Sequence, residues 1–121
     1  MILIVDDDAD IRETLCEVLQ DEGYAVATAR NGREALDALR QAEHVCLVLL
    51  DLMMPVMSGR EFLQRQSAEP KLASIPVVVM SAVWDDDGGT VAAFLRKPIP
   101  LRALLSCAEQ YCVEKQHAGS T

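Results

Sequence analysis

The chain has 121 residues, half of them hydrophobic, and a formal net charge of −8 at pH 7. This length suits a single domain, 1–121, with a polar tail from about residue 116, and its apolar content can bury a core without cross-links. The acidic charge argues against direct binding to nucleic acid, because a phosphate backbone is also negative. No apolar run is long enough for a membrane span or a signal peptide, so we expect a cytoplasmic protein.

Short apolar runs alternate with amphipathic segments, which indicates an α/β domain with a parallel sheet. Ile2–Val5 is a continuous apolar run, typical of a strand covered on both faces. The helix pattern that follows is expected to stop at Gly23, and Tyr24–Ala27 predicts a short strand at a sheet edge. Asn31, with Glu34 three residues later, predicts the N-cap of a second helix.

The rest of the chain predicts three more strands and two more helices. The strands are expected at Cys46–Leu50, Pro76–Met80 and Ala93–Arg96. A capping box from Ser58 to Glu61 begins one helix, and Pro100 suits the first position of the other. The apolar stripe of this last helix is Leu101, Leu104, Leu105, Ala108 and Cys112. Right-handed crossovers favour an open sheet of order 2-1-3-4-5 with helices on both faces.

The four cysteines are Cys16, Cys46, Cys107 and Cys112. None forms a Cys-x-x-Cys pair, and neither histidine lies at zinc-ligand spacing from them. Three of the four fall within apolar helix or strand patterns, where a reduced thiol behaves as a small hydrophobic group. We therefore expect reduced cysteines, with a disulfide between the last two as the open alternative.

Polar residues follow the buried strands directly. Asp6 and Asp7 follow the first strand, Asp51 the third, Ser81 the fourth and Lys97 the fifth. Because the carboxyl ends of parallel strands meet at one edge, these side chains are expected in one crevice. Three carboxylates there would repel one another, and an all-oxygen ligand set favours Mg²⁺ over zinc. The hydroxyl of Ser81 and the ammonium of Lys97 would complete a binding site for a phosphoryl group. An aspartate can accept such a group as an acyl phosphate.

Each of these residues alone has a plain structural interpretation. The aspartate pair could be an N-cap cluster, Asp51 a turn residue and Lys97 a surface lysine. The joint occurrence at four strand ends is what favours a site.

Four strings at these strand ends carry a family resemblance: Ile2–Asp8, Leu50–Gly59, Ser81-Ala82 and Phe94–Ile99. In this order they resemble response-regulator receiver domains of the CheY-like superfamily, over nearly the whole chain. The resemblance implies a flavodoxin-like fold. It also implies a phosphoacceptor module of a two-component or phosphorelay system that switches partner interactions. Such a module catalyses its own phosphorylation on Asp51 and its own slow dephosphorylation and is not otherwise an enzyme.

The resemblance implies that Asp51 receives the phosphoryl group from a histidine kinase or a histidine phosphotransfer protein. Asp7, Asp51 and the main-chain carbonyl of Met53 would bind Mg²⁺ directly, and Asp6 would act through water. The downstream target is not named by the sequence, and a homodimer is one possibility.

Two side chains are implied to switch on phosphorylation. Ser81 would contact the phosphoryl oxygens together with Lys97, and Phe94 would turn inward. Phe94 fits a plain core aromatic equally well. The Lys97–Pro98 bond resembles one that is cis in the family.

In the family, fast self-dephosphorylation is associated with a polar side chain near the site. The corresponding positions are the second residue after Asp51 and the second residue after Ser81. These positions here hold Met53 and Val83. We therefore expect slow dephosphorylation, over minutes or longer.

One departure from the family lies between Ser81 and Lys97. These residues are 16 positions apart, shorter than usual by about one and a half helical turns. Asp85–Gly89 is turn-like, which predicts that the family's fourth helix is shortened or missing. Trp84 in this segment packs over its own loop or anchors a partner.

Three rival functions share some of these features. A receiver-like interaction module that needs no phosphorylation would keep the fold and bind through the altered segment. A phosphatase with a nucleophilic aspartate usually needs a second acid where Met53 stands. A nucleotide-binding protein would need a glycine-rich loop after the first strand, which the sequence lacks.

Overall fold

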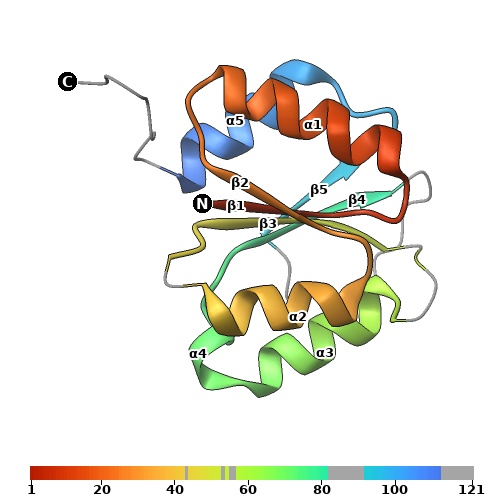
Figure 1. Ribbon diagram of the computed structural model, residues 1–121, viewed down its shortest axis with the longest axis vertical. Coiled ribbons are helices and arrows are strands. Elements are labelled where there is room, and N and C mark those ends of the chain that lie inside the picture. The colour runs from red at the N-terminus through yellow and green to blue at the C-terminus, as the bar shows by residue number, and fades with distance from the viewer. Residues whose placement is uncertain (43, 53, 55–56, 82–91, 113–121) are drawn as a thin grey trace.

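The computed structural model describes residues 1–42, 44–52, 54, 57–81 and 92–112. Within these ranges a five-stranded sheet has the order β2-β1-β3-β4-β5, and every pair of neighbours is parallel. Helices cover both faces of the sheet (Figure 1). The predicted fold class and strand order are therefore confirmed.

The strands are β1 (Ile2–Val5), β2 (Val26–Ala29), β3 (Leu47–Asp51), β4 (Val77–Ser81) and β5 (Ala93–Arg96). The helices are α1 (Ala9–Asp21), α2 (Gly32–Gln41), α3 (Gly59–Ala68), α4 (Pro70–Ala73) and α5 (Leu101–Tyr111). In Figure 1, α1 and α5 lie on one side of the sheet, and α2, α3 and α4 lie on the other.

Two hydrophobic clusters, one on each face, hold the layers together. Successive strand residues point to opposite faces, so each central strand contributes to both clusters. In β3, Val48 and Leu50 pack with the buried residues of α2 and α3, whereas Leu47 and Leu49 pack with those of α1 and α5. The continuous apolar strands of the sequence are thus explained by burial on two sides.

Strand β2 begins two residues later than predicted, because the chain first completes the end of α1. Gly23 has a φ of 94°, the left-handed conformation that glycine adopts without strain. Its N–H donates to the carbonyl of Gln20, and the N–H of Tyr24 donates to that of Leu19. This pair of bonds is a Schellman motif, so Tyr24 belongs to the helix terminus rather than to the strand.

Two predicted helix caps are confirmed. Asn31 accepts a hydrogen bond from the N–H of Glu34 at 2.9 Å, and the Ser58 hydroxyl accepts one from Glu61 at 3.2 Å. The start of α5 was predicted wrongly, since Pro100 is its N-cap rather than its first residue. Leu101, assigned to the apolar stripe, is 54% exposed.

The cysteine expectation was wrong for two residues. Cys46 and Cys112 form a disulfide, while Cys16 and Cys107 are free thiols. The periodicity of the segments indicated apolar surroundings for three of the four cysteines. It carried no information that the start of β3 and the end of α5 meet in space.

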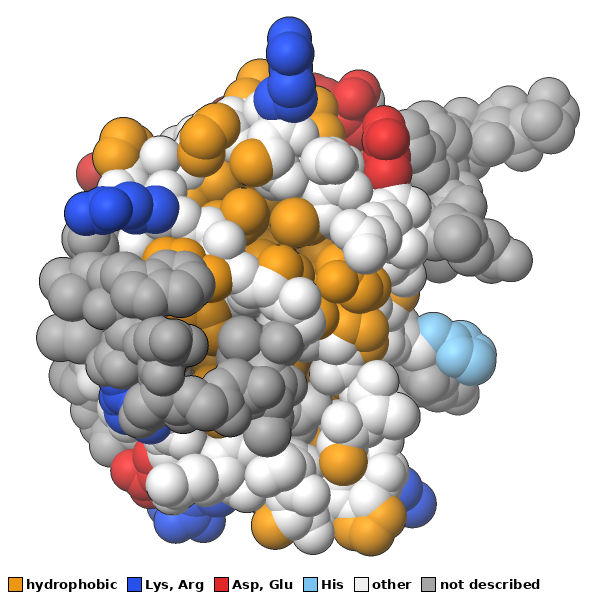
Figure 2. Space-filling model, turned by 180° about the vertical axis from the view of Figure 1, so that it is seen from behind, with side chains coloured by type: hydrophobic (Ala, Val, Ile, Leu, Met, Phe, Trp, Pro, Cys, Tyr) orange, Lys and Arg blue, Asp and Glu red, His pale blue; other side chains and the backbone are white. Residues whose placement is uncertain are grey.

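Seen from the side of β5, hydrophobic side chains gather near the centre of the surface (Figure 2). Strand β5 is an edge strand, and its residues Phe94 and Leu95 are only partly buried. None of the helices in the described ranges has the length and apolarity needed to cross a membrane.

Several predictions fall outside the described residues. These are the shortened fourth helix and Trp84 within 82–91, the Met53 carbonyl, the Val83 side chain and the polar tail. The short helix α4, in contrast, lies between α3 and β4 and was not predicted. The Lys97–Pro98 peptide bond is cis, as the resemblance implied.

Candidate functional site

The predicted polar residues lie together at the carboxyl edge of the sheet. Asp6 follows the last residue of β1, Asp51 ends β3, Ser81 ends β4, and Lys97 follows the last residue of β5. Strand pairing in register brings these ends side by side, since Asp51 pairs with the residue before Ser81. Parallel pairing has therefore converted four distant sequence positions into one local site.

Three carboxylates form the acidic part of the site. One carboxylate oxygen from each of Asp6, Asp7 and Asp51 lies within 4.8 Å of the other two. Asp6 and Asp51 are buried, and Asp7 is exposed. Two buried carboxylates this close carry a large electrostatic cost unless positive charge reaches them.

Lys97 supplies part of that positive charge. Its Nζ lies 2.9 Å from Oδ2 of Asp6 and 3.5 Å from Oδ2 of Asp51. Burial by itself would lower the pKa of Lys97, but the hydrogen bond to Asp6 and the charges of Asp51 and Asp6 outweigh it, so the pKa is raised. The ammonium is held charged between the two buried carboxylates.

The start of α1 fixes the loop that carries the aspartates. Asp8 is the N-cap and accepts hydrogen bonds from the N–H groups of Asp10 and Ile11. The N–H of Asp8 itself donates to Oδ1 of Asp6 at 2.9 Å. Asp8 therefore serves the helix rather than the acidic cluster, which separates its role from that of Asp7.

Arg12 was not singled out from the sequence. Its guanidinium donates to the main-chain carbonyl of Asp6 at 2.7 Å, which ties the second turn of α1 to the end of β1. A helical arginine four residues after the N-cap Asp8 was the signal that could have found it. Asp6 is thus held at its main chain by Arg12 and at its carboxylate by Lys97.

The two predicted switch residues occupy different surroundings. Ser81 is 2% exposed, and its carbonyl accepts a hydrogen bond from the N–H of Lys97 at 2.8 Å. Phe94 is partly buried and packs against the cluster that contains Leu50 and Val79. Its position on β5 fits both the core aromatic and the switch interpretation.

The donor set suits a hard divalent cation. All three clustered side chains offer carboxylate oxygens, which are ligands that Mg²⁺ and Ca²⁺ prefer. Asp7 is exposed at the rim, so an ion there would keep positions open to water or phosphate oxygens. The residues present therefore fit a bound Mg²⁺.

Comparisons with known proteins agree with this geometry. The family model of the response regulator receiver domain matches residues 2–109. This chain belongs to that family, the receiver domains of two-component response regulators.

Among curated relatives, an uncharacterised 14.6 kDa protein of Leptolyngbya boryana is 35% identical over 118 residues, covering 93% of this chain and 89% of that protein. The CpxR homolog of Haemophilus influenzae, a transcriptional regulatory protein, is 41% identical over 85 residues. That match covers 70% of this chain and only 35% of the regulator.

Solved structures give the same result for the fold. The chemotaxis protein CheY4 of Vibrio cholerae has a TM-score of 0.83 at 29% identity, with 91% of this chain and 96% of that chain covered. A signal receiver domain of a histidine kinase from Syntrophus aciditrophicus also has a TM-score of 0.83, at 28% identity, with 99% and 95% covered. Receivers that resemble this chain thus occur both as separate proteins and as domains of kinases.

Proposed function

We propose that this receiver accepts a phosphoryl group on Asp51 from a phosphohistidine, carried by a histidine kinase or a histidine phosphotransfer protein. The observation that carries the proposal is the meeting of three carboxylates within 4.8 Å with Lys97 between two of them. Such a site combines a nucleophile with the positive charge that phosphoryl transfer requires.

In the transfer, a carboxylate oxygen of Asp51 forms a bond to phosphorus and the bond from phosphorus to the donor imidazole nitrogen breaks. The electron pair of the broken bond returns to that nitrogen. The product on this chain is an acyl phosphate.

The remaining residues have supporting roles. Asp7 and Asp51, with the carbonyl of Met53, would hold Mg²⁺ directly, and Asp6 would act through a water ligand. The ion supplies charge neutralisation at the phosphoryl oxygens. Lys97 and Ser81 would bind those oxygens, which would move Lys97 from the carboxylates toward the phosphoryl group. Phosphorylation would then alter partner binding, with Ser81 and Phe94 as the residues that respond.

Intact mass after incubation with acetyl phosphate and Mg²⁺ tests the proposal. The wild-type protein is expected to gain one phosphoryl group, and Asp51→Asn is expected to gain none, because an amide is not a nucleophile at this position. A chelator is expected to abolish the gain.

Asp8→Asn is the matched control. It removes a charge from the same acidic loop but keeps a good N-cap, since asparagine caps as well as aspartate. It should be phosphorylated as the wild type is. If neither the wild type nor Asp8→Asn gains mass although both are folded, the result favours an interaction module that works without phosphorylation.

The decay of the phosphorylated mass over time tests the slow self-dephosphorylation expected from the apolar residues Met53 and Val83. Persistence for minutes or longer supports that part of the proposal. Loss within seconds contradicts it without affecting the assignment of Asp51.

A further inference from the structure

A disulfide lies at the amino edge of the sheet, opposite to Asp51. Cys46 directly precedes β3, and Cys112 directly follows α5. The two residues are 66 positions apart in the chain, and their Cα atoms are separated by 5.3 Å, within the usual range for a disulfide. The bond ties the last turn of α5 to the start of a central strand.

The fold does not require this bond for lack of a core. Both faces of the sheet carry a buried hydrophobic cluster, and β1, β3 and β4 are buried along their whole length. Disulfides are needed as structural supports chiefly in domains too small to bury enough apolar surface. The presence of the disulfide is therefore not explained by a need to stabilise a small hydrophobic core.

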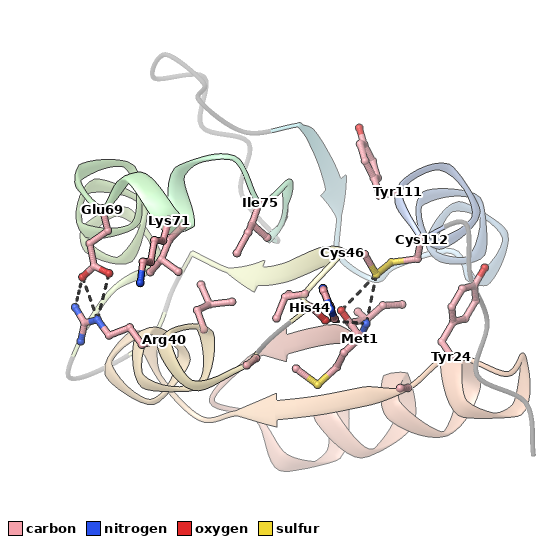
Figure 3. A pocket seen from close by; sticks show the side chains of 16 residues that line it. Met1, Tyr24, Arg40, His44, Cys46, Glu69, Lys71, Ile75, Tyr111 and Cys112 are labelled. Atoms are coloured by element: carbon pink, nitrogen blue, oxygen red, sulfur yellow. Dashed lines mark hydrogen bonds and ion pairs between the residues drawn. A yellow bond between two sulfur atoms is a disulfide. The ribbon is translucent and has the colours of Figure 1, made fainter.

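A pocket gives access to the bond. It has a volume of about 870 Å³ and is lined by both cysteines together with Met1, His44 and Tyr111. Figure 3 shows the disulfide at one end of this pocket and the Arg40–Glu69 ion pair at the other. Cys46 is partly exposed, whereas Cys112 is buried, so attack by a small thiol is expected at Cys46.

The surroundings of both sulfurs also suit the reduced state. Sγ of Cys46 lies 3.3 Å from the main-chain carbonyl oxygen of Met1, which can accept a hydrogen bond from a thiol. Cys112 lies in the apolar cluster with Leu19 and Tyr24, where a thiol packs as a small hydrophobic group.

The two free cysteines are less suited to exchange. Burial raises the pKa of the Cys107 thiol, and burial together with the charge of Glu17 raises that of Cys16. A raised pKa lowers the fraction of thiolate, which is the reactive form. Cys107 lies on α5, which Cys112 directly follows, and provides an internal control.

We propose that Cys46 and Cys112 form a reversible thiol–disulfide site, in exchange with low-molecular-weight thiols through this pocket, that fixes or releases the C-terminal end of α5. A thiolate of the small thiol attacks Sγ of Cys46, and Cys112 leaves as a thiolate that takes up a proton. A second small thiol then attacks the mixed disulfide and releases Cys46. In total, two electrons and two protons pass to the cysteine pair, and the small thiols become one disulfide.

Reduction is expected to act on α5 locally and on the whole fold. The last turn of α5 loses its covalent link to β3. The buried residues Leu104, Cys107 and Ala108 keep the rest of the helix packed on the sheet. Main-chain amides of that turn should then exchange faster with solvent than those nearer the start of the helix. Opening a cross-link across 66 positions should also raise the equilibrium constant for unfolding by a factor on the order of 10² to 10³.

The first experiment titrates the full chain with mixtures of reduced and oxidised glutathione. After an acid quench, maleimide labels the thiols and intact mass counts them. The count is expected to shift from four labelled thiols to two as the oxidised share rises. Two thiols at every ratio would mean a fixed structural bond, and four at every ratio would mean no bond; either result overturns the proposal.

Variants identify the pair and its effect on α5. Cys46→Ser and Cys112→Ser should each remove the shift, whereas Cys107→Ser should keep it. Hydrogen exchange of α5 should differ between oxidised and reduced wild type and should not respond to reductant in Cys46→Ser. Equal exchange of α5 in both states of the wild type would overturn the anchoring role, and this measurement does not require that any variant folds.

Discussion

Two glycines begin helices, Gly32 in α2 and Gly59 in α3, and they differ in what a side chain would meet. A Cβ added to Gly59 would lie 2.6 Å from Cα of Leu52 and 2.8 Å from the main-chain oxygen of Asp51. A Cβ added to Gly32 would lie 2.8 Å from Cγ of Met57. The first contact is with backbone at the site, and the second is with a flexible side chain.

Gly59→Ala is therefore expected to destabilise the fold by roughly 1–3 kcal/mol, because the backbone after β3 must move to admit the methyl group. It should also reduce phosphorylation, since the displaced oxygen belongs to Asp51. Gly32→Ala is the matched control with a smaller cost, because the Met57 side chain can adopt another rotamer. Urea denaturation measures both costs; equal costs would show that the backbone contact is relieved without strain.

Helix α2 begins with a reciprocal set of hydrogen bonds. Asn31 caps Glu34, and the Glu34 carboxylate accepts from the main-chain N–H of Arg30 at 2.9 Å and from its guanidinium at 3.1 and 2.9 Å. The backbone hydrogen bond from Arg30, followed by the side-chain bond, holds the pKa of Glu34 below its ordinary value.

A depressed carboxyl pKa stabilises the fold above the unfolded pKa, near 4.5 for glutamate, and this contribution is lost as the pH falls through the folded pKa. Glu34→Gln should therefore lower the free energy of unfolding at neutral pH, and the two proteins should converge in acid. Solvent screening at this exposed pair keeps the difference below about 1 kcal/mol. Urea denaturation at neutral and acidic pH checks this; a difference that is the same at both would contradict it.

Elements were predictable where the signal is local. The caps at Asn31 and Ser58 follow from side chains that bond their own backbone, and β1 and β5 follow from short apolar runs. Strand β2 was displaced because the motif that ends α1 used Tyr24, a residue with a strong strand preference. Helix α4 has only four residues, too few to produce a periodic pattern.

At the scale of the whole molecule, an acidic chain gathers three of its carboxylates at the candidate site. The chain carries a net charge of −8, and three of its carboxylates lie within 4.8 Å of one another with one lysine beside them. Such a cluster of like charges lowers stability, which is a common cost of functional sites, and a bound cation would offset that cost.

Mg²⁺ is therefore expected to raise the melting temperature beyond the effect of NaCl at equal ionic strength. At a free concentration of about one hundred times its dissociation constant, the ion would add about 2.7 kcal/mol to the free energy of unfolding. Asp7→Asn should abolish the additional effect without disturbing the buried pair formed by Asp6 and Lys97. Equal shifts with both salts, or an unchanged response of the variant, would show that the cluster does not bind the ion.

The convergence of Asp6, Asp7, Asp51, Ser81 and Lys97 was predictable because parallel strands align their ends. The meeting of Cys46 and Cys112 was not, because it depends on the length and tilt of α5 across the sheet. Arg12 was missed for a related reason, since its contact with Asp6 depends on how α1 is placed over the end of β1. Strand ends are aligned in every parallel sheet, so that part of the site follows from the fold class. The disulfide and the Arg12 contact depend on how long α5 and α1 are and how they lie on the sheet in this protein.

The disulfide also limits how far the C-terminal end of α5 can move. The helix is joined to β5 at one end by the segment Lys97–Pro100, where two prolines restrict the backbone, and to β3 at the other by the cross-link. In the oxidised chain, α5 is therefore linked covalently to the sheet near both of its ends. In the reduced chain, only its amino-terminal end keeps such a link. Its 11 residues span about 16 Å, so any displacement on reduction should be greatest at Cys112 and least at the end that Lys97–Pro100 joins to β5.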